Sequence, residues 1–275
     1  MWEHHVEVRL APRQNADQQV LDVELAIDPP CAPRSYDDCF GNHVHYCALI
    51  APHDHFALRL RAEVVTSLDN PFAFSTVPPA GEREWIAERL RLQPRLWDYL
   101  LHRSPVTPDL HALAISDLAI PVREADQPLL DAVLAALEWI GDVLTYEPGF
   151  TPAPPPLAEV LTRRVGGSQD LAHLLISIVR GWGFAARYVM GYRDPGYVED
   201  EGGVQRLHAW AEILVPGAGW RGVDPTTRLV ANQTYIAVAV GRDASDAVPI
   251  KAVFQGGEEP EEAGMEAVVE VSGDQ

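Results

Sequence analysis

Apolar and polar residues alternate along two stretches near the start of the chain. Apolar side chains occupy every second position in residues 21–27 and in residues 56–64, and most positions between them are charged. A period of two is typical of a strand that buries one face, and residues 43–51 form a third candidate strand. Short strands at this spacing predict an antiparallel sandwich or barrel, which ends in the proline-containing residues 70–81.

The pattern then becomes helical. Residues 82–103 carry apolar side chains at three- and four-residue spacings, with an interruption at Pro94. Residues 128–145 are clearer, because their apolar side chains recur on one face. Pro128 stands at the start of this segment, where its missing N–H costs no hydrogen bond. The proline-rich residues 147–156 predict an extended loop.

Two helices and several strands are predicted in the rest of the chain. A short helix over residues 157–164 leads to a glycine pair, and a second helix covers residues 169–182. The strand-like segments are residues 184–192, 207–215, 219–224, 234–240 and 265–271. A helix followed by several strands indicates an α+β core whose sheet packs against that helix. We therefore expect a β-rich domain in residues 1–80 and an α+β core in residues 81–275.

The composition fits a folded protein with a substantial core, since 47% of the 275 residues are hydrophobic and 22% are charged. A formal charge of −19 argues against nucleic acid, because phosphate backbones attract clustered Lys and Arg. No apolar run reaches the roughly 18 residues that cross a bilayer, and the first ten residues lack the features of a signal peptide. We expect a cytoplasmic protein that binds neither nucleic acid nor membrane.

Cysteine and histidine usage gives little support for a disulfide framework or a metal site. The three cysteines all lie in the first fifth of the chain, without paired CxxC spacing, at Cys31, Cys39 and Cys47. His43 and His45, like His53 and His55, are two residues apart and could share one face of a strand. Because no carboxylate or cysteine pattern accompanies them, we expect neither a metal nor another cofactor.

One candidate for chemistry is the segment Gly166-Gly167-Ser168-Gln169-Asp170, which directly precedes an apolar helix. Two glycines let the backbone turn sharply and approach a substrate closely. The next residue lies at the helix N-terminus, where free N–H groups and the helix dipole favour negative charge. Ser168 is therefore well placed to be a nucleophile, although a serine in this position is also a common helix cap.

A second candidate is a pair of short strands joined by a turn-rich linker. His208 begins the segment LHAWAE, and Asp224 ends the segment GWRGVD. In a hairpin these two residues can lie on neighbouring strands, with the carboxylate orienting the imidazole. Each residue also has an ordinary interpretation, His208 as a strand histidine and Asp224 as a turn residue before Pro225.

Together these segments resemble the bacterial transglutaminase-like family. The similarity is carried by RRVGGSQDLAHLLISIVRGWGFAARYVMGYR and by LHAWAEILVPGAGWRGVDPTTRL. In that family a glycine-rich turn precedes Cys-Gln-Asp and an Ala-His-Leu helix, and His-Ala-Trp and Asp-Pro-Thr follow. The likeness continues through YIAVAVGRDASDAVPIKAVFQGG and reaches back into DDCFGNHVHYCALIAPHDHFALRLRAEV, so it covers most of the chain. It implies a papain-like transglutaminase core behind an N-terminal antiparallel β-sandwich or barrel-like domain.

The resemblance assigns roles position by position. Ser168 occupies the place of the nucleophile, His208 that of the base, and Asp224 that of the residue that orients the base. Asp170 matches a residue that holds the loop at the helix start, and His173 is interpreted as a core or supporting residue. Trp210 is expected to pack beneath the site or simply in the core.

The family carries cysteine where this chain has Ser168. A helix start and a nearby imidazolium can turn a thiol into a thiolate, whereas an alcohol needs a base that removes its proton during attack. Three interpretations stay open: a working Ser-His-Asp hydrolase, an inactive relative that binds peptide-like ligands, and a thiol enzyme whose cysteine was replaced by design. None of the three cysteines can substitute, since all lie in the N-terminal β region.

The resemblance also implies a reaction class. The expected reaction is acyl transfer from a peptide or amide substrate, and hydrolysis is favoured over protein crosslinking. This chemistry needs no metal. A homo-oligomer is compatible with the sequence, which does not fix the oligomeric state.

Overall fold

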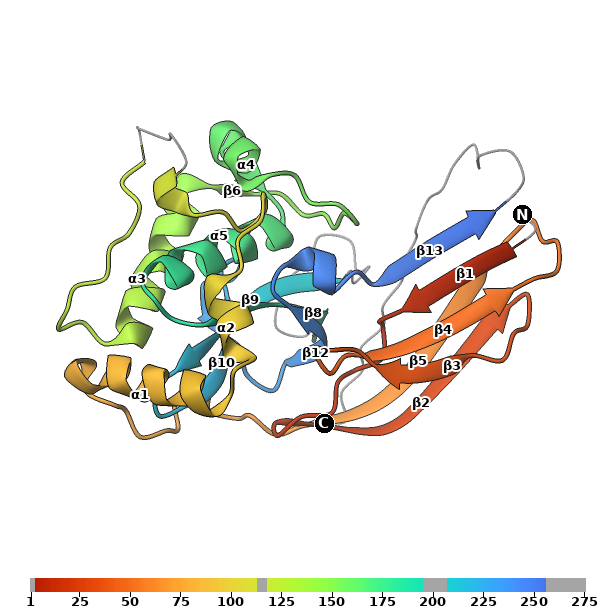
Figure 1. Cartoon of the computed structure of the whole chain (residues 1–275), viewed down its shortest axis with the longest axis horizontal. Helices are drawn as coiled ribbons and strands as arrows, with labels where there is room; N and C mark the ends of the chain where they lie inside the picture. The colour runs from red at the N-terminus through yellow and green to blue at the C-terminus, as the bar shows by residue number, and fades with distance from the viewer. Residues whose placement is uncertain (1–2, 113–117, 195–206, 256–275) are drawn as a thin grey trace.

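The structure, a computed structural model, describes residues 3–112, 118–194 and 207–255. Figure 1 shows the helices gathered around one sheet at one end of the molecule, while the N-terminal strands extend from the other end. Within the described residues, no helix combines the length and the apolar character that crossing a membrane requires. The predicted α+β class is confirmed.

The N-terminal strands form two separate antiparallel units. The first is a four-stranded sheet in the order β13-β1-β4-β3, and the second is the two-stranded ribbon of β2 and β5. Their bounds are β1 Glu3–Val8, β2 Gln18–Asp28, β3 Arg34–Asp37, β4 His43–Leu49, β5 Ala57–Thr66 and β13 Ile250–Gln255. The predicted strands at residues 21–27, 43–51 and 56–64 are confirmed. The barrel alternative is wrong, because the described strands form no closed barrel.

The strand β13 comes from the far end of the chain. It pairs antiparallel with β1, with Glu7 opposite Lys251, so the N-terminal sheet is not built from residues 1–80 alone. The division at residue 80 stays a prediction. Three strands of this N-terminal sheet were not predicted from the sequence, namely β1, β3 and β13. The strand expected at residues 265–271 lies outside the described residues.

The helices follow the predicted pattern closely. They are α1 Pro79–Leu92, α2 Leu96–Leu101, α3 Leu129–Val143, α4 Leu157–Arg163 and α5 Ser168–Gly181, with short 3-10 turns η1 Leu110–Ala112 and η3 Ala244–Asp246. The break at Pro94 separates α1 from α2, and α3 begins directly after Pro128. Residues 147–156 contain neither helix nor strand, as their prolines predict.

The second sheet has five antiparallel strands in the order β11-β10-β9-β8-β12. These strands are β8 Ala186–Arg193, β9 His208–Val215, β10 Gly219–Asp224, β11 Leu229–Val230 and β12 Tyr235–Gly241. A short parallel pair, β6 Thr145–Tyr146 with β7 Val165–Gly166, leads into α5. The polypeptide therefore reaches α5 through an extended segment that is itself fixed by main-chain hydrogen bonds.

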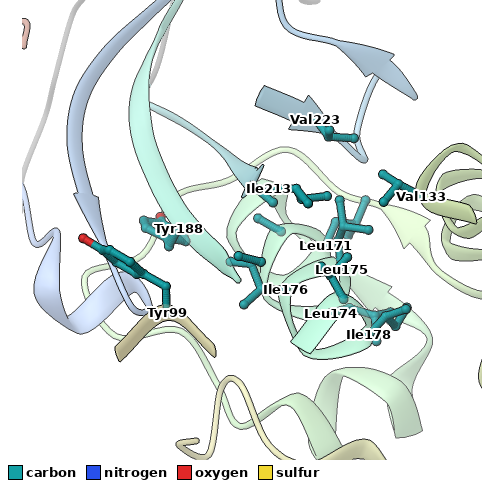
Figure 2. Packing of buried hydrophobic residues seen from close by; sticks show 14 of the residues in the cluster. Tyr99, Val133, Leu171, Leu174, Leu175, Ile176, Ile178, Tyr188, Ile213 and Val223 are labelled. Atoms are coloured by element: carbon teal, nitrogen blue, oxygen red, sulfur yellow. The ribbon is translucent and has the colours of Figure 1, made fainter. Parts of the chain in front are cut away.

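Helix α5 is the centre of the core. Every residue from Ser168 to Arg180 is buried, because β8 and β9 pack on one side of the helix and α3 and α4 on others. Figure 2 shows Leu171 and Leu175 of α5 close to Val133 of α3 and Ile213 of β9. Full burial of one such side chain contributes about 1.5–3 kcal/mol. The packing thus fixes the helix that begins at Ser168.

The N-terminal region holds the outer edge of β12. The Gln18 side chain accepts a hydrogen bond from Ala237 N at 2.8 Å and donates to Ala237 O at 2.9 Å. The Asn42 side chain does the same with Val240, with both distances at 2.8 Å. Gln18 and Asn42 are buried, so these two amides satisfy main-chain groups that water does not reach.

We expect Gln18→Ala to lower the free energy of unfolding by about 1–3 kcal/mol, the cost of leaving a buried polar group without a partner. The N–H of Ala237 would lose its acceptor, whereas its C=O would keep Arg13 N as a donor at 2.9 Å. Urea denaturation measures the change. The matched control is Gln19→Ala on the exposed face of β2, which should leave the midpoint unchanged. Equal losses in both variants would contradict this assignment.

Candidate active site

The glycine turn before α5 is tightly packed. A Cβ on Gly166 would lie 2.9 Å from Cβ of Asp170, and one on Gly167 would lie 3.1 Å from Gly149 O. The Asp170 carboxylate accepts the Gly167 N–H at 2.9 Å, which closes the turn onto the helix. Burial raises the pKa of Asp170, and the Gly167 N–H opposes that shift. The turn therefore has glycine at 166 because no larger side chain fits beside Asp170.

The proline-rich loop is tied to the same helix start. The Gln169 side chain accepts from Thr151 N at 2.8 Å and donates to Thr151 O at 2.9 Å. In addition, Glu147 N donates to Gly166 O at 3.0 Å. This loop is thus held against residues 166 and 169, which flank Ser168 in the sequence. Apart from the place of Gln169 in the family motif, nothing in the sequence indicates this role.

His208 and Asp224 meet at one end of the second sheet. His208 is the first residue of β9, Asp224 is the last of β10, and the two strands pair antiparallel with Val223 opposite Ala211. The His208 Nε2 lies 2.8 Å from Asp224 Oδ2. Because an ionised carboxylate only accepts, Nε2 carries the proton of this hydrogen bond. The hairpin geometry expected from the sequence is present.

Ser168 lies beside the same strand. Its Oγ accepts a hydrogen bond from Ala209 N, the residue after His208, at 3.3 Å. Among the described residues, this contact to the main chain, and not one to the His208 ring, joins the hydroxyl to β9. The exposure of these residues is low throughout, at 2% for Ser168, 5% for His208 and 0% for Asp224. The structure therefore brings the three predicted residues together in a nearly closed site.

Asp224 is held by several donors at once. Its Oδ2 accepts from Tyr235 Oη at 2.8 Å and lies 3.4 Å from Arg193 Nη1, and its Oδ1 accepts from Thr226 N at 2.9 Å. Burial alone would raise the pKa of Asp224, but the His208 charge and hydrogen bond, followed by Arg193 and Tyr235, lower it to about 2. The carboxylate is therefore ionised at neutral pH. Neither Arg193 nor Tyr235 is predicted from the sequence, since no motif marks their neighbourhoods.

Trp210 packs against the imidazole, with ring centroids 6.2 Å apart and planes 24° apart. Glycines on the adjacent strands leave room for the indole: a Cβ on Gly191 would lie 2.6 Å from Trp210 Cη2, and one on Gly222 would lie 3.1 Å from Trp210 Nε1. The tryptophan is thus both a core residue and a support for His208.

His173 lies inside α5, away from the role of base. Its Nε2 accepts from Ala244 N at 3.1 Å, and its ring stacks on Tyr188 with centroids 5.1 Å apart. Burial lowers the pKa of His173 to about 4, so the ring is neutral near pH 7. These contacts agree with its interpretation as a core residue.

Arg180 fixes the other end of α5. Its guanidinium is buried and donates to the carbonyls of Ala186 at 2.8 Å, Arg242 at 2.7 Å and Tyr99 at 2.8 Å. A cation near a helix C-terminus also interacts favourably with the helix dipole. Burial lowers the pKa of Arg180 to about 9, which still leaves it charged at pH 7. Helix α5 is therefore anchored at both ends.

The histidines of the N-terminal region do not assemble a metal site in the described part of the chain. No group of three or more His, Cys, Asp or Glu side chains with suitable geometry occurs there. His43 contacts Asp37 at 3.1 Å, whereas His55 contacts Asp54 at 2.9 Å. The two histidine pairs therefore have separate neighbours.

The buried His173 predicts an acid-dependent stability. The unfolded chain binds a proton on this residue below about pH 6.5, whereas the folded protein does so only near pH 4. Stability should thus be constant above pH 6.5 and fall by ~3 kcal/mol between pH 6.5 and pH 4 from this group alone. His173→Gln should flatten the slope in that window, as measured by urea denaturation at several pH values. His111→Gln changes an exposed histidine and serves as the control. A slope of stability against pH that is as steep in His173→Gln as in His111→Gln would contradict this prediction.

Comparison with known families agrees with the geometry. Residues 116–225 match the transglutaminase-like superfamily, and residues 1–65 match the bacterial transglutaminase-like N-terminal region. The first of these matches lies in the α+β core, and the second lies in the N-terminal strands. The relatives include an uncharacterized protein of Mycobacterium tuberculosis, 31% identical over 255 residues, which span 89% of this chain and 80% of that protein. Another, from Mycobacterium leprae, is 29% identical over 252 residues, or 91% and 86% of the two chains.

A solved structure has the same fold. A candidate cysteine protease from Cytophaga hutchinsonii superposes with a TM-score of 0.70 and 23% identity, covering 93% of this chain and 82% of that one. This similarity confirms the papain-like α+β fold expected from the sequence.

Proposed function

The chain belongs to the transglutaminase-like superfamily, and we propose that it is an acyl-transfer enzyme that hydrolyses amide or peptide bonds. In this proposal Ser168 is the nucleophile, His208 the general base and Asp224 the residue that orients the base. The observation that carries it is the buried pair of His208 and Asp224, 2.8 Å apart, next to a hydroxyl at the N-terminus of α5.

The contacts suggest how each group would act. Ser168 Oγ attacks the carbonyl carbon while its proton passes to His208 Nδ1, because Nε2 is already bonded to Asp224. The imidazolium that forms is stabilised by the ionised carboxylate. N–H groups at the start of α5 face the developing oxyanion. His208 then protonates the leaving amine, and water attacks the acyl-serine with His208 again as the base.

The serine at position 168 makes this mechanism depend on the general base. An alcohol is not ionised by a nearby cation at neutral pH, so attack depends on the base more than it would for a thiol. An ionised Asp224 with four donors around it favours a well-oriented His208. The replacement of the family's cysteine by serine also favours one second candidate, a protein that binds peptides without turnover. The experiments below separate the two.

A serine-directed fluorophosphonate should label the folded protein at Ser168, because the hydroxyl lies at the start of α5 and beside the strand that carries the proposed base. Ser168→Ala should abolish labelling, and His208→Ala should slow it by at least about a thousandfold. Intact-protein mass spectrometry measures the added group. Ser177→Ala removes another buried serine of α5 and serves as the control, which should label at the wild-type rate. A folded wild-type protein that resists the reagent would favour the peptide-binding candidate.

Ser168→Cys tests whether the site is arranged for a charged nucleophile. A thiol at the start of α5 and close to His208 should have a pKa below the ordinary value of about 8.5. It should therefore react quickly with iodoacetamide at pH 6–7. Peptide mapping separates it from Cys31, Cys39 and Cys47. In the double variant with His208→Ala, the reaction should slow to the rate of an ordinary thiol. The same rate with and without His208 would show that the imidazole does not act on position 168.

A further inference from the structure

Tyr235 is the first residue of β12, and it contacts the carboxylate that orients His208. Its Oη lies 2.8 Å from Asp224 Oδ2 and 3.2 Å from Thr227 Oγ1. The ionised carboxylate can only accept, so the tyrosine hydroxyl donates its single proton to Asp224. Thr227 must then donate to the tyrosine. The hydrogen bonds therefore run in one direction, from Thr227 through Tyr235 to Asp224.

The ring of Tyr235 is fixed as well as its hydroxyl. It meets Trp210 edge to face, with centroids 5.3 Å apart and planes 75° apart. Trp210 in turn stacks on His208. Tyr235 and His208 thus contact the same oxygen of Asp224 and the same indole. Burial raises the pKa of Tyr235, and the neighbouring carboxylate raises it further, so the phenol keeps its proton.

The strand that carries Tyr235 is positioned by the N-terminal region. On one side of the tyrosine, Thr66 Oγ1 donates to Gln233 O at 2.8 Å, and Gln233 N donates to Leu68 O at 2.9 Å. On the other side, the Gln18 side chain makes its two hydrogen bonds to Ala237. Residues two before and two after Tyr235 are therefore both held by hydrogen bonds to the β-rich region.

We propose that Tyr235 is a positioning residue that holds Asp224 in the orientation that His208 requires, and that the N-terminal region acts on the site by fixing β12. The effect on reactivity rests on the function proposed above, whereas the effect on the imidazole hydrogen bond does not.

The test compares Tyr235→Phe with Tyr192→Phe. Both changes remove one tyrosine hydroxyl and keep the ring. Tyr192 is a residue of β8 and lies opposite Ile236 of β12. Its hydroxyl donates to Leu10 O at 3.1 Å and not to Asp224. Tyr192→Phe thus loses one hydrogen bond of a partly buried tyrosine, whereas Tyr235→Phe loses two, the one to Asp224 and the one from Thr227. Thermal unfolding checks that both variants are folded. Only Tyr235→Phe changes the surroundings of Asp224.

Two readouts follow the site. The first is the proton NMR signal of the His208 Nε2–H, which should exchange slowly with water in the wild type and in Tyr192→Phe. In Tyr235→Phe it should shift and exchange faster. The second is fluorophosphonate labelling, in which the maximal rate should fall at least about tenfold, as expected for losing a hydrogen bond to a charged group, while the half-saturating concentration stays constant.

The outcomes distinguish the two proposals. A His208 signal that changes in Tyr235→Phe but not in Tyr192→Phe supports the positioning role. This holds even if the wild-type protein proves unreactive and the proposed hydrolase function fails. An unchanged signal, with a labelling rate equal to that of Tyr192→Phe, overturns the positioning role while leaving the hydrolase function intact.

Discussion

The buried hydrogen bond between His208 and Asp224 is the interaction on which the site depends. A carboxylate with no exposed surface is costly to keep ionised, and it persists only where enough donors surround it. The donors to Asp224 come from separate parts of the chain, and one of them, Tyr235, is a residue of β12. Because the charged Asp224 accepts from Nε2, the Nδ1 of a neutral His208 ring carries no proton.

The rest of the fold can be understood as the means of holding that pair next to Ser168. Helix α5 is buried along its whole length, tied at its start by Asp170 and Gln169 and at its end by Arg180. The sheet edge at β12 is covered by side-chain amides from the N-terminal region, of which Gln18 is the clearest. The β-rich part of the molecule is thus joined by hydrogen bonds to the main chain of β12, the strand that carries Tyr235.

Much of this arrangement could be predicted from the sequence, for physical reasons that also mark the limits. Long periodic elements such as α3 and the ribbon strand β5 leave a clear pattern, and the glycine turn before Ser168 has few alternatives. The pairing of β13 with β1 was not predictable, since it joins segments more than 240 residues apart and neither has a local turn signal. Tyr235 and Arg193 were missed because their function comes from pairing across strands and not from any local motif.

The central claim is that Ser168 is a working nucleophile, and the most direct measurement is acyl-enzyme formation with p-nitrophenyl acetate. Rapid mixing follows the release of nitrophenolate, and peptide mapping of the quenched protein locates the acetyl group. The account predicts a burst of about one equivalent, with the acetyl group on Ser168 and its loss on standing as water resolves the ester. A folded protein that releases nitrophenolate without acetyl on Ser168, or that shows no release above the buffer rate, would contradict it.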